Sequence, residues 1–74
     1  MSNIPDGVYK DDVIRAIDQC VIGKNGERDR KILYRRLIDG IGYEDLSAEF
    51  GISVRHLKDI VPTREDKIFK YLGF

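Results

Sequence analysis

The segment YEDLSAEFGISVRHLKDIV, residues 43–61, has the pattern of two short helices joined by a tight turn. Leu46 and Phe50 lie four residues apart and therefore share one face of the first helix. Gly51 follows directly and can adopt the positive φ that often ends a helix. Ser53 is a favourable N-cap for the second helix. This order is typical of a helix-turn-helix, whose second helix enters the major groove of DNA.

The second helix of this pair is predicted over residues 53–61, with Ile52 filling the angle between the two helices. Its apolar positions lie on one side and its polar positions elsewhere: Val54, Leu57, Ile60 and Val61 against Arg55, His56, Lys58 and Asp59. We expect Phe50 to be buried between the helices. Pro62 is expected to stop the second helix, because a residue before proline avoids the α region. Periodicity alone also fits a plain helical hairpin in a small bundle.

Two more helices are predicted upstream, over about residues 10–21 and 27–39. The loop GKNG at residues 23–26 separates them. This loop lacks the glycine, lysine and Ser/Thr spacing of a phosphate-binding loop, and no strand precedes it. We interpret it as a connector, and we expect Gly40 to end the second of these helices.

A last helix is predicted from about residue 64 to residue 72, with Thr63 at its N-terminus in a pattern similar to a capping box. Residues 1–9 are expected to form a flexible leader. Residues 10–74 then make one helical domain. The predicted fold is all-α, a small four- to five-helix bundle that contains a helix-turn-helix at residues 43–61.

Charge is balanced overall but not along the chain. Thirteen basic and thirteen acidic residues give a formal net charge of zero, which counts against a strong non-specific nucleic-acid binder. Residues 42–52 carry three acidic residues and no basic ones, whereas residues 53–74 carry five basic against three acidic, or +2. We therefore expect the helix near residue 53 to approach phosphates and the acidic helix to face away from them.

No pattern for catalysis is present in the sequence. There is no pair of carboxylates with catalytic spacing, no metal-binding cluster and no nucleophile next to a base. Cys20 and His56 fall on different predicted helices, and Cys20 is expected to be a packed thiol. Asp11 and Asp12 suit the positive end of a helix dipole better than a metal site. We expect no enzyme activity, no metal and no cofactor.

The chain begins with Met and shows no signal peptide and no apolar run of about twenty residues. Its single cysteine allows no intrachain disulfide. These features predict a complete, soluble, cytoplasmic protein that does not interact with a membrane.

A family resemblance covers nearly half of the chain. The run ERDRKILYRRLIDGIGYEDLSAEFGISVRHLKDI, residues 27–60, resembles region four of bacterial RNA polymerase sigma factors. It is still more similar to the small stand-alone proteins of phages and mobile elements that share this domain. The resemblance implies binding to double-stranded DNA, often at promoter elements. The base-contacting positions of the family correspond here to Ser53, Val54, Arg55, Lys58 and Asp59. The promoter-melting and core-binding regions of a full initiation factor are absent.

The first functional hypothesis is a sequence-specific DNA-binding regulator of bacterial transcription, of phage or mobile-element origin. Arg55 is expected to read a guanine edge through its guanidinium fork. Lys58 and Arg64, together with Arg35, are expected to hold phosphates. The predicted DNA-binding set is Ser53, Val54, Arg55, His56, Lys58, Asp59, Arg64, Arg35 and Tyr43. For His56 the alternative is a structural role at a helix edge.

The second hypothesis is a protein-interaction module with the same fold, and the zero net charge favours it. Its exposed helix would bind RNA polymerase or a host protein rather than DNA. The predicted last helix is rich in apolar side chains: Ile68, Phe69, Tyr71, Leu72 and Phe74. They are expected to close the core, and they also offer a surface for a homodimer.

Overall fold

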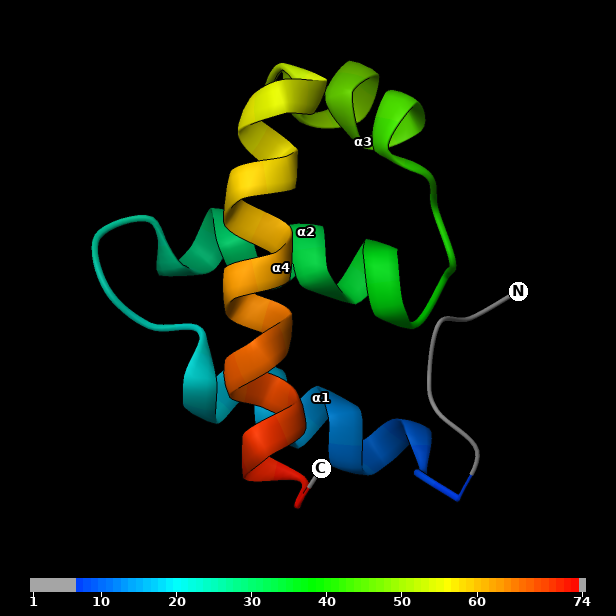
Figure 1. The fold of residues 1–74 in the computed structure, drawn as a ribbon, viewed down its shortest axis with the longest axis vertical. Helices are drawn as coiled ribbons and strands as arrows, with labels where there is room; N and C mark the ends of the chain where they lie inside the picture. Colours follow the sequence, from blue (N-terminus) through cyan, green and yellow to red (C-terminus); the bar gives the residue numbers. More distant parts are fainter. Residues whose placement is uncertain (1–6, 74) are drawn as a thin grey trace.

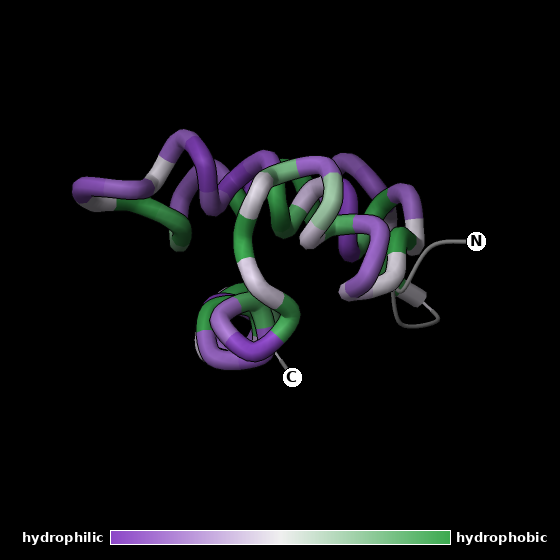
Figure 2. The backbone as a smooth tube through the Cα atoms, turned by 90° about the horizontal axis from the view of Figure 1, so that it is seen from above, coloured by the Kyte–Doolittle hydropathy of each residue, from purple (hydrophilic) through white to green (hydrophobic). Residues whose placement is uncertain are grey.

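The computed structural model describes residues 7–73, which form four helices and no strand (Figure 1). The helices are α1 (Lys10–Cys20), α2 (Gly26–Leu37), α3 (Tyr43–Phe50) and α4 (Val54–Tyr71). Each of α1, α2 and α3 packs against α4. Figure 2 looks along α4 and shows the other three helices on one side of it. The predicted all-α class is confirmed over the described residues.

The N-terminus of α1 is held by Tyr9, whose carbonyl accepts hydrogen bonds from the N–H groups of Asp12 and Val13 at 3.1 and 3.2 Å. Val8 packs against the core. The last residues of the predicted leader therefore contribute to the fold, and residues 1–6 lie outside the described residues. Cys20 is half-buried at the end of α1, and its thiol lies 3.7 Å from the carbonyl oxygen of Lys67.

Two glycines end helices as predicted. Gly40 follows α2 with φ 70°, and the next N–H, that of Ile41, donates to the carbonyl of Arg35 at 3.1 Å. Gly51 follows α3 with φ 67° and ψ 31°, and its N–H donates to the carbonyl of Ser47 at 2.9 Å. Both are left-handed conformations that a side chain disfavours. Gly42 is the N-cap of α3, and it offers no side-chain hydrogen bond.

The prediction that Pro62 ends the second helix was wrong. The helix α4 runs without interruption from Val54 to Tyr71, so the predicted helices at 53–61 and 64–72 are one element. A proline inside a helix costs about 3 kcal/mol. Three side chains on the inner side of α4 are fully buried: Leu57, Val61 and Ile68. At roughly 1.5–3 kcal/mol each, their burial outweighs that cost.

The local environment also limits the penalty at Pro62. Its ring cannot donate to the carbonyl of Lys58, but both residues are exposed, so that carbonyl can be hydrated. Thr63, predicted to cap a new helix, instead donates its hydroxyl to the carbonyl of Asp59 at 3.1 Å. Such a bond to the preceding turn is compatible with a continuing helix.

The core lies between α4 and the other helices. It consists of aliphatic side chains: Val13, Ala16, Ile17, Val21, Ile32, Leu33, Leu37, Ile38, Leu46, Ile52, Leu57, Val61 and Ile68. The prediction that Phe50 is buried between α3 and α4 was wrong, because its side chain is half-buried and packs on the outside of this core. Leu46 and Ile52 occupy the space between the two helices instead. Ile52 is buried, in agreement with its predicted apolar role.

The C-terminal end of α4 uses most of its apolar surface for the core. Ile68 is fully buried, and Phe69 and Leu72 are partly buried against the core. Tyr71 is 53% exposed, and Phe74 lies outside the described residues. The surface predicted for a homodimer is therefore reduced, within residues 7–73, mainly to Tyr71.

None of the helices in the described part of the chain is both long enough and apolar enough to cross a membrane.

Candidate nucleic-acid interface

The start of α4 is defined by its N-cap, Ser53. Its hydroxyl oxygen accepts a hydrogen bond from the N–H of His56 at 3.1 Å, and its carbonyl accepts from the N–H of Leu57 at 3.0 Å. Ser53 itself is extended, with φ −61° and ψ 149°. A side-chain cap of this kind stabilises a helix by about 1 kcal/mol, and it fixes the first turn.

Buried side chains then set which way α4 faces. Leu46 of α3 and Leu57 of α4 are both 0% exposed, and Ile52 between the helices is 9% exposed. Val54 is half-buried beside them. Because these residues occupy the inner side of the helix, the remaining positions of its first turns project outward.

We call the outward positions the exposed face of α4. It comprises Ser53, Arg55, His56, Lys58 and Asp59, all of which are exposed. Five of the nine predicted DNA-binding residues thus lie on one continuous surface. Neither Arg55 nor the Asp59 carboxylate forms an ion pair with another described residue.

Tyr43, the first residue of α3, lies at the edge of this face. The guanidinium carbon of Arg36 is 4.5 Å from the centre of the Tyr43 ring, and the Lys58 ammonium is 6.0 Å from it. Both distances are within the range of cation–π attraction. Arg36 also donates to the carbonyl of Ile41 at 3.0 Å. The ring therefore links α2 and α4 beside the exposed face.

Arg35 is on a different side of α2 and is held by two carboxylates. Its guanidinium donates twice to Glu49, at 2.9 Å in each bond, and once to Asp39 at 2.8 Å. These hydrogen bonds, first to Glu49 and then to Asp39, raise the pKa of Arg35 above its ordinary value. A phosphate contact by Arg35 would have to replace these bonds. The structure thus brings Arg35 to α3 and not to the exposed face of α4.

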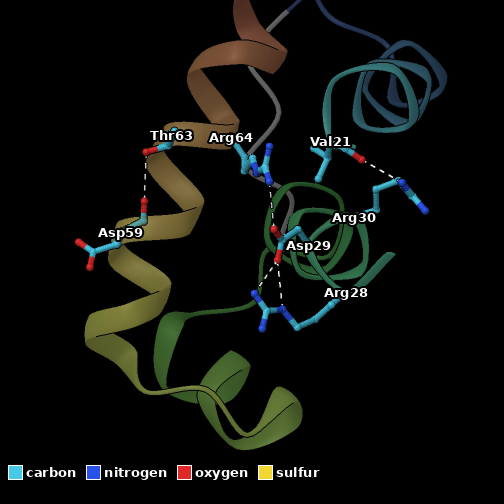
Figure 3. A network of polar contacts seen from close by, with 7 residues as sticks. All are labelled: Val21, Arg28, Asp29, Arg30, Asp59, Thr63 and Arg64. Atoms are coloured by element: carbon cyan, nitrogen blue, oxygen red, sulfur yellow. Dashed lines mark hydrogen bonds and ion pairs between the residues drawn. The ribbon is translucent and has the colours of Figure 1, made fainter. Parts of the chain in front are cut away.

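Arg64 is likewise turned into the molecule. Figure 3 shows Arg64 and Arg28 on either side of Asp29, and Asp59 pointing outward from the same stretch of α4. Arg64 donates to one oxygen of Asp29 at 3.3 Å, and Arg28 donates to the other at 3.1 and 3.2 Å. Asp29 is only 3% exposed. This contact joins the start of α2 to the middle of α4.

Asp29 and Arg36 have contacts that the sequence did not predict. Both lie in the arginine-rich stretch from residue 27 to residue 39, where charges appear at almost every turn. Asp29 contacts Arg64, which is 35 residues away, as well as the adjacent Arg28, and Arg36 contacts Tyr43 on another helix. A local pattern does not distinguish such a residue from its solvated neighbours. The sequence does contain one signal for Asp29. It is three and four residues from Ile32 and Leu33, so it shares their face of the helix.

Two apolar depressions lie on either side of Tyr34 and Lys31 of α2. One, of about 180 Å³, is lined by α1 and α2 residues that include Ile14 and Ile17. The other, of about 480 Å³, is lined by α2 and α3 residues that include Phe50. Residues 7–73 contain no group of three or more His, Cys, Asp or Glu side chains that could hold a metal ion.

Comparison of the chain with protein-family models, with curated proteins and with solved structures gives no match.

Proposed function

We propose that this protein is a sequence-specific DNA-binding regulator of transcription, in which α3 and α4 act as a helix-turn-helix. The observation that carries the proposal is the exposed face of α4. It presents Arg55 and Lys58 on a capped helix that is seated by buried leucines. An arginine fork fits the major-groove edge of guanine, and lysine fits a phosphate.

The distribution of charge supports this orientation. The first turn of α4 contains no acidic residue, whereas the first turn of α3 contains Glu44 and Asp45. A polyanion approaching the two helices is attracted at Arg55 and Lys58 and repelled at the start of α3. The proposed DNA contacts are therefore made by Arg55 and Lys58 with their neighbours on the exposed face. Arg35 and Arg64, which are paired with carboxylates, have a mainly structural role in this proposal.

The experiment is selection from a random pool of DNA duplexes, followed by a salt titration on the selected site. Affinity is expected to fall steeply with salt, because phosphate contacts release counterions. Arg55→Ala is expected to weaken specific binding by about 1–3 kcal/mol and to relax one base position. Arg15→Ala is the matched control, since Arg15 is an exposed arginine on α1 with only a 3.8 Å contact to Asp12. Failure of the wild type to enrich any motif would overturn the proposal.

A second candidate is a protein-interaction module, for example one that binds RNA polymerase. The net charge of zero and the apolar depressions beside Tyr34 favour it. The same selection separates the two functions. A protein that uses α4 only against another protein enriches no DNA motif and shows no steep salt dependence.

A further inference from the structure

The exposed face of α4 carries one carboxylate, that of Asp59, among its basic residues. Asp59 lies four residues after Arg55, the spacing at which oppositely charged helical side chains commonly pair. No Arg55–Asp59 ion pair within 4.0 Å is formed. Figure 3 shows the Asp59 carboxylate pointing away from α2 and from the rest of the bundle. Both charged groups are therefore available to a ligand.

Lys58 lies between Arg55 and Asp59 in the sequence, and its side chain extends toward α3. The Lys58 ammonium lies 6.0 Å from the centre of the Tyr43 ring, at the edge of α3. Thr63, the next residue at the same spacing, uses its hydroxyl for the carbonyl of Asp59. Arg55 and Asp59 thus form a stripe along the outer side of the helix. Arg55 offers five hydrogen-bond donors, and the Asp59 carboxylate only accepts hydrogen bonds.

A carboxylate on this stripe does not suit a phosphate. It repels the DNA backbone, and no described cation neutralises it. It does suit a base edge that offers only a donor in the major groove, which is the amino group at N4 of cytosine. Arginine suits the two acceptors of guanine, N7 and O6.

Resting on the proposed DNA-binding function, we propose that α4 reads a guanine with Arg55 and a cytosine with Asp59. Four residues advance about 6 Å along a helix, and base pairs are stacked about 3.4 Å apart. The two bases therefore lie within about two base-pair steps of each other. Asp59 is a specificity-determining residue, because it lowers affinity for DNA that offers no donor at its position.

The test compares motifs selected from a random duplex pool by the wild type, Asp59→Asn and Asp66→Asn. Asparagine recognises adenine through N6 and N7, so Asp59→Asn is expected to change the cytosine position of the motif to adenine. Asp66→Asn removes the same charge from an exposed carboxylate further along α4, which pairs with Lys70 at 3.0 Å. Its motif is expected to match that of the wild type. Thermal melting followed by circular dichroism verifies that each variant is folded.

A second measurement uses the selected site with its cytosine base pair replaced. This replacement is expected to lower the affinity of the wild type roughly 5- to 140-fold. For Asp59→Ala it is expected to have almost no effect, because the acceptor is already absent. An equal loss for both proteins, or an unchanged motif for Asp59→Asn, would overturn the role of Asp59 while leaving the proposed function intact. If the wild type enriches no motif, both proposals fail.

Discussion

The two halves of α4, residues 54–62 and 63–71, both carry charged residues but use them differently. In the first half, Arg55 and Asp59 are exposed and form no ion pair with a described residue. In the second half, Arg64 binds the buried Asp29, and Lys70 binds Asp66 at 3.0 Å. Arg64 thus joins α4 to α2, whereas the charged groups of Arg55 and Asp59 are available to a ligand. A partner elsewhere in the fold therefore distinguishes a charged residue with a structural role from one that is available for binding.

The same comparison applies to neighbouring arginines of α2. Arg35 is bound by Glu49 and Asp39, so it fastens α3 to α2. Arg36 stacks on Tyr43, which reaches the edge of the exposed face of α4. Successive helical positions differ by about 100° in direction, so adjacent arginines can serve unrelated surfaces. Arg35 thus serves the contact between α2 and α3, whereas Arg36 contacts the ring at the edge of the exposed face of α4.

The largest effect we predict concerns Asp29, the carboxylate that joins α2 to the second half of α4. Asp29→Asn leaves Arg64 and Arg28 facing a neutral amide, and the free energy of unfolding is expected to fall by about 1–3 kcal/mol. The lower part of the range reflects the water that still reaches Arg64, whose side chain is 23% exposed. Urea unfolding measures the change. Asp66→Asn, at an exposed pair, is the control and is expected to change stability by less than about 0.5 kcal/mol. Equal effects for the two variants would show that the buried Asp29 contact stabilises the fold no more than an exposed ion pair does.

The next effect concerns Pro62, which stands at the boundary between the two halves. Pro62→Ala restores an N–H that can donate to the carbonyl of Lys58, and it removes the clash of the ring with the preceding turn. We expect the free energy of unfolding to rise by about 1–2 kcal/mol. This is less than the full helix penalty of about 3 kcal/mol, because proline also restricts the unfolded chain. Urea unfolding at several temperatures is the measurement. A loss of stability would mean that the native helix requires the proline.

Residues whose roles depend on near neighbours were predictable from the sequence. Gly51 ends α3, and Ser53 caps α4, because each acts within one helical turn. The burial of Leu46, Ile52 and Leu57 followed from their spacing. The exposed positions of the candidate site were predictable for the same reason, since they are what the apolar stripe of α4 leaves over.

Residues whose roles depend on distant partners were not predictable. The local preference of Pro62 predicts the end of a helix, but the burial of Val61 and Ile68 on either side of it in the sequence outweighs that preference. Arg64 was predicted to hold a phosphate, and nothing in the sequence indicates its contact with Asp29, 35 residues away. Phe50 shares a helical face with Leu46, yet only Leu46 fits into the core. In each case the deciding contact joins two helices that the sequence does not place side by side.

The smallest effect we predict concerns Glu65, next to Arg64 in the structural half of α4. Burial raises the pKa of the Glu65 carboxyl, and attraction to Arg36 partly opposes this rise. An acid whose pKa is higher in the folded state binds its proton more readily there, so its stabilising contribution is present in acid and is lost as pH rises through that pKa.

Glu65→Gln removes the charged form and is expected to raise the free energy of unfolding at neutral pH. The gain should be below about 1 kcal/mol, because the side chain is only partly buried. Urea unfolding of both proteins across the acid range is the measurement. The difference between them is expected to shrink as pH falls through the raised pKa of Glu65. A difference that stays constant with pH would indicate a packing effect of the substitution and not the charge of Glu65.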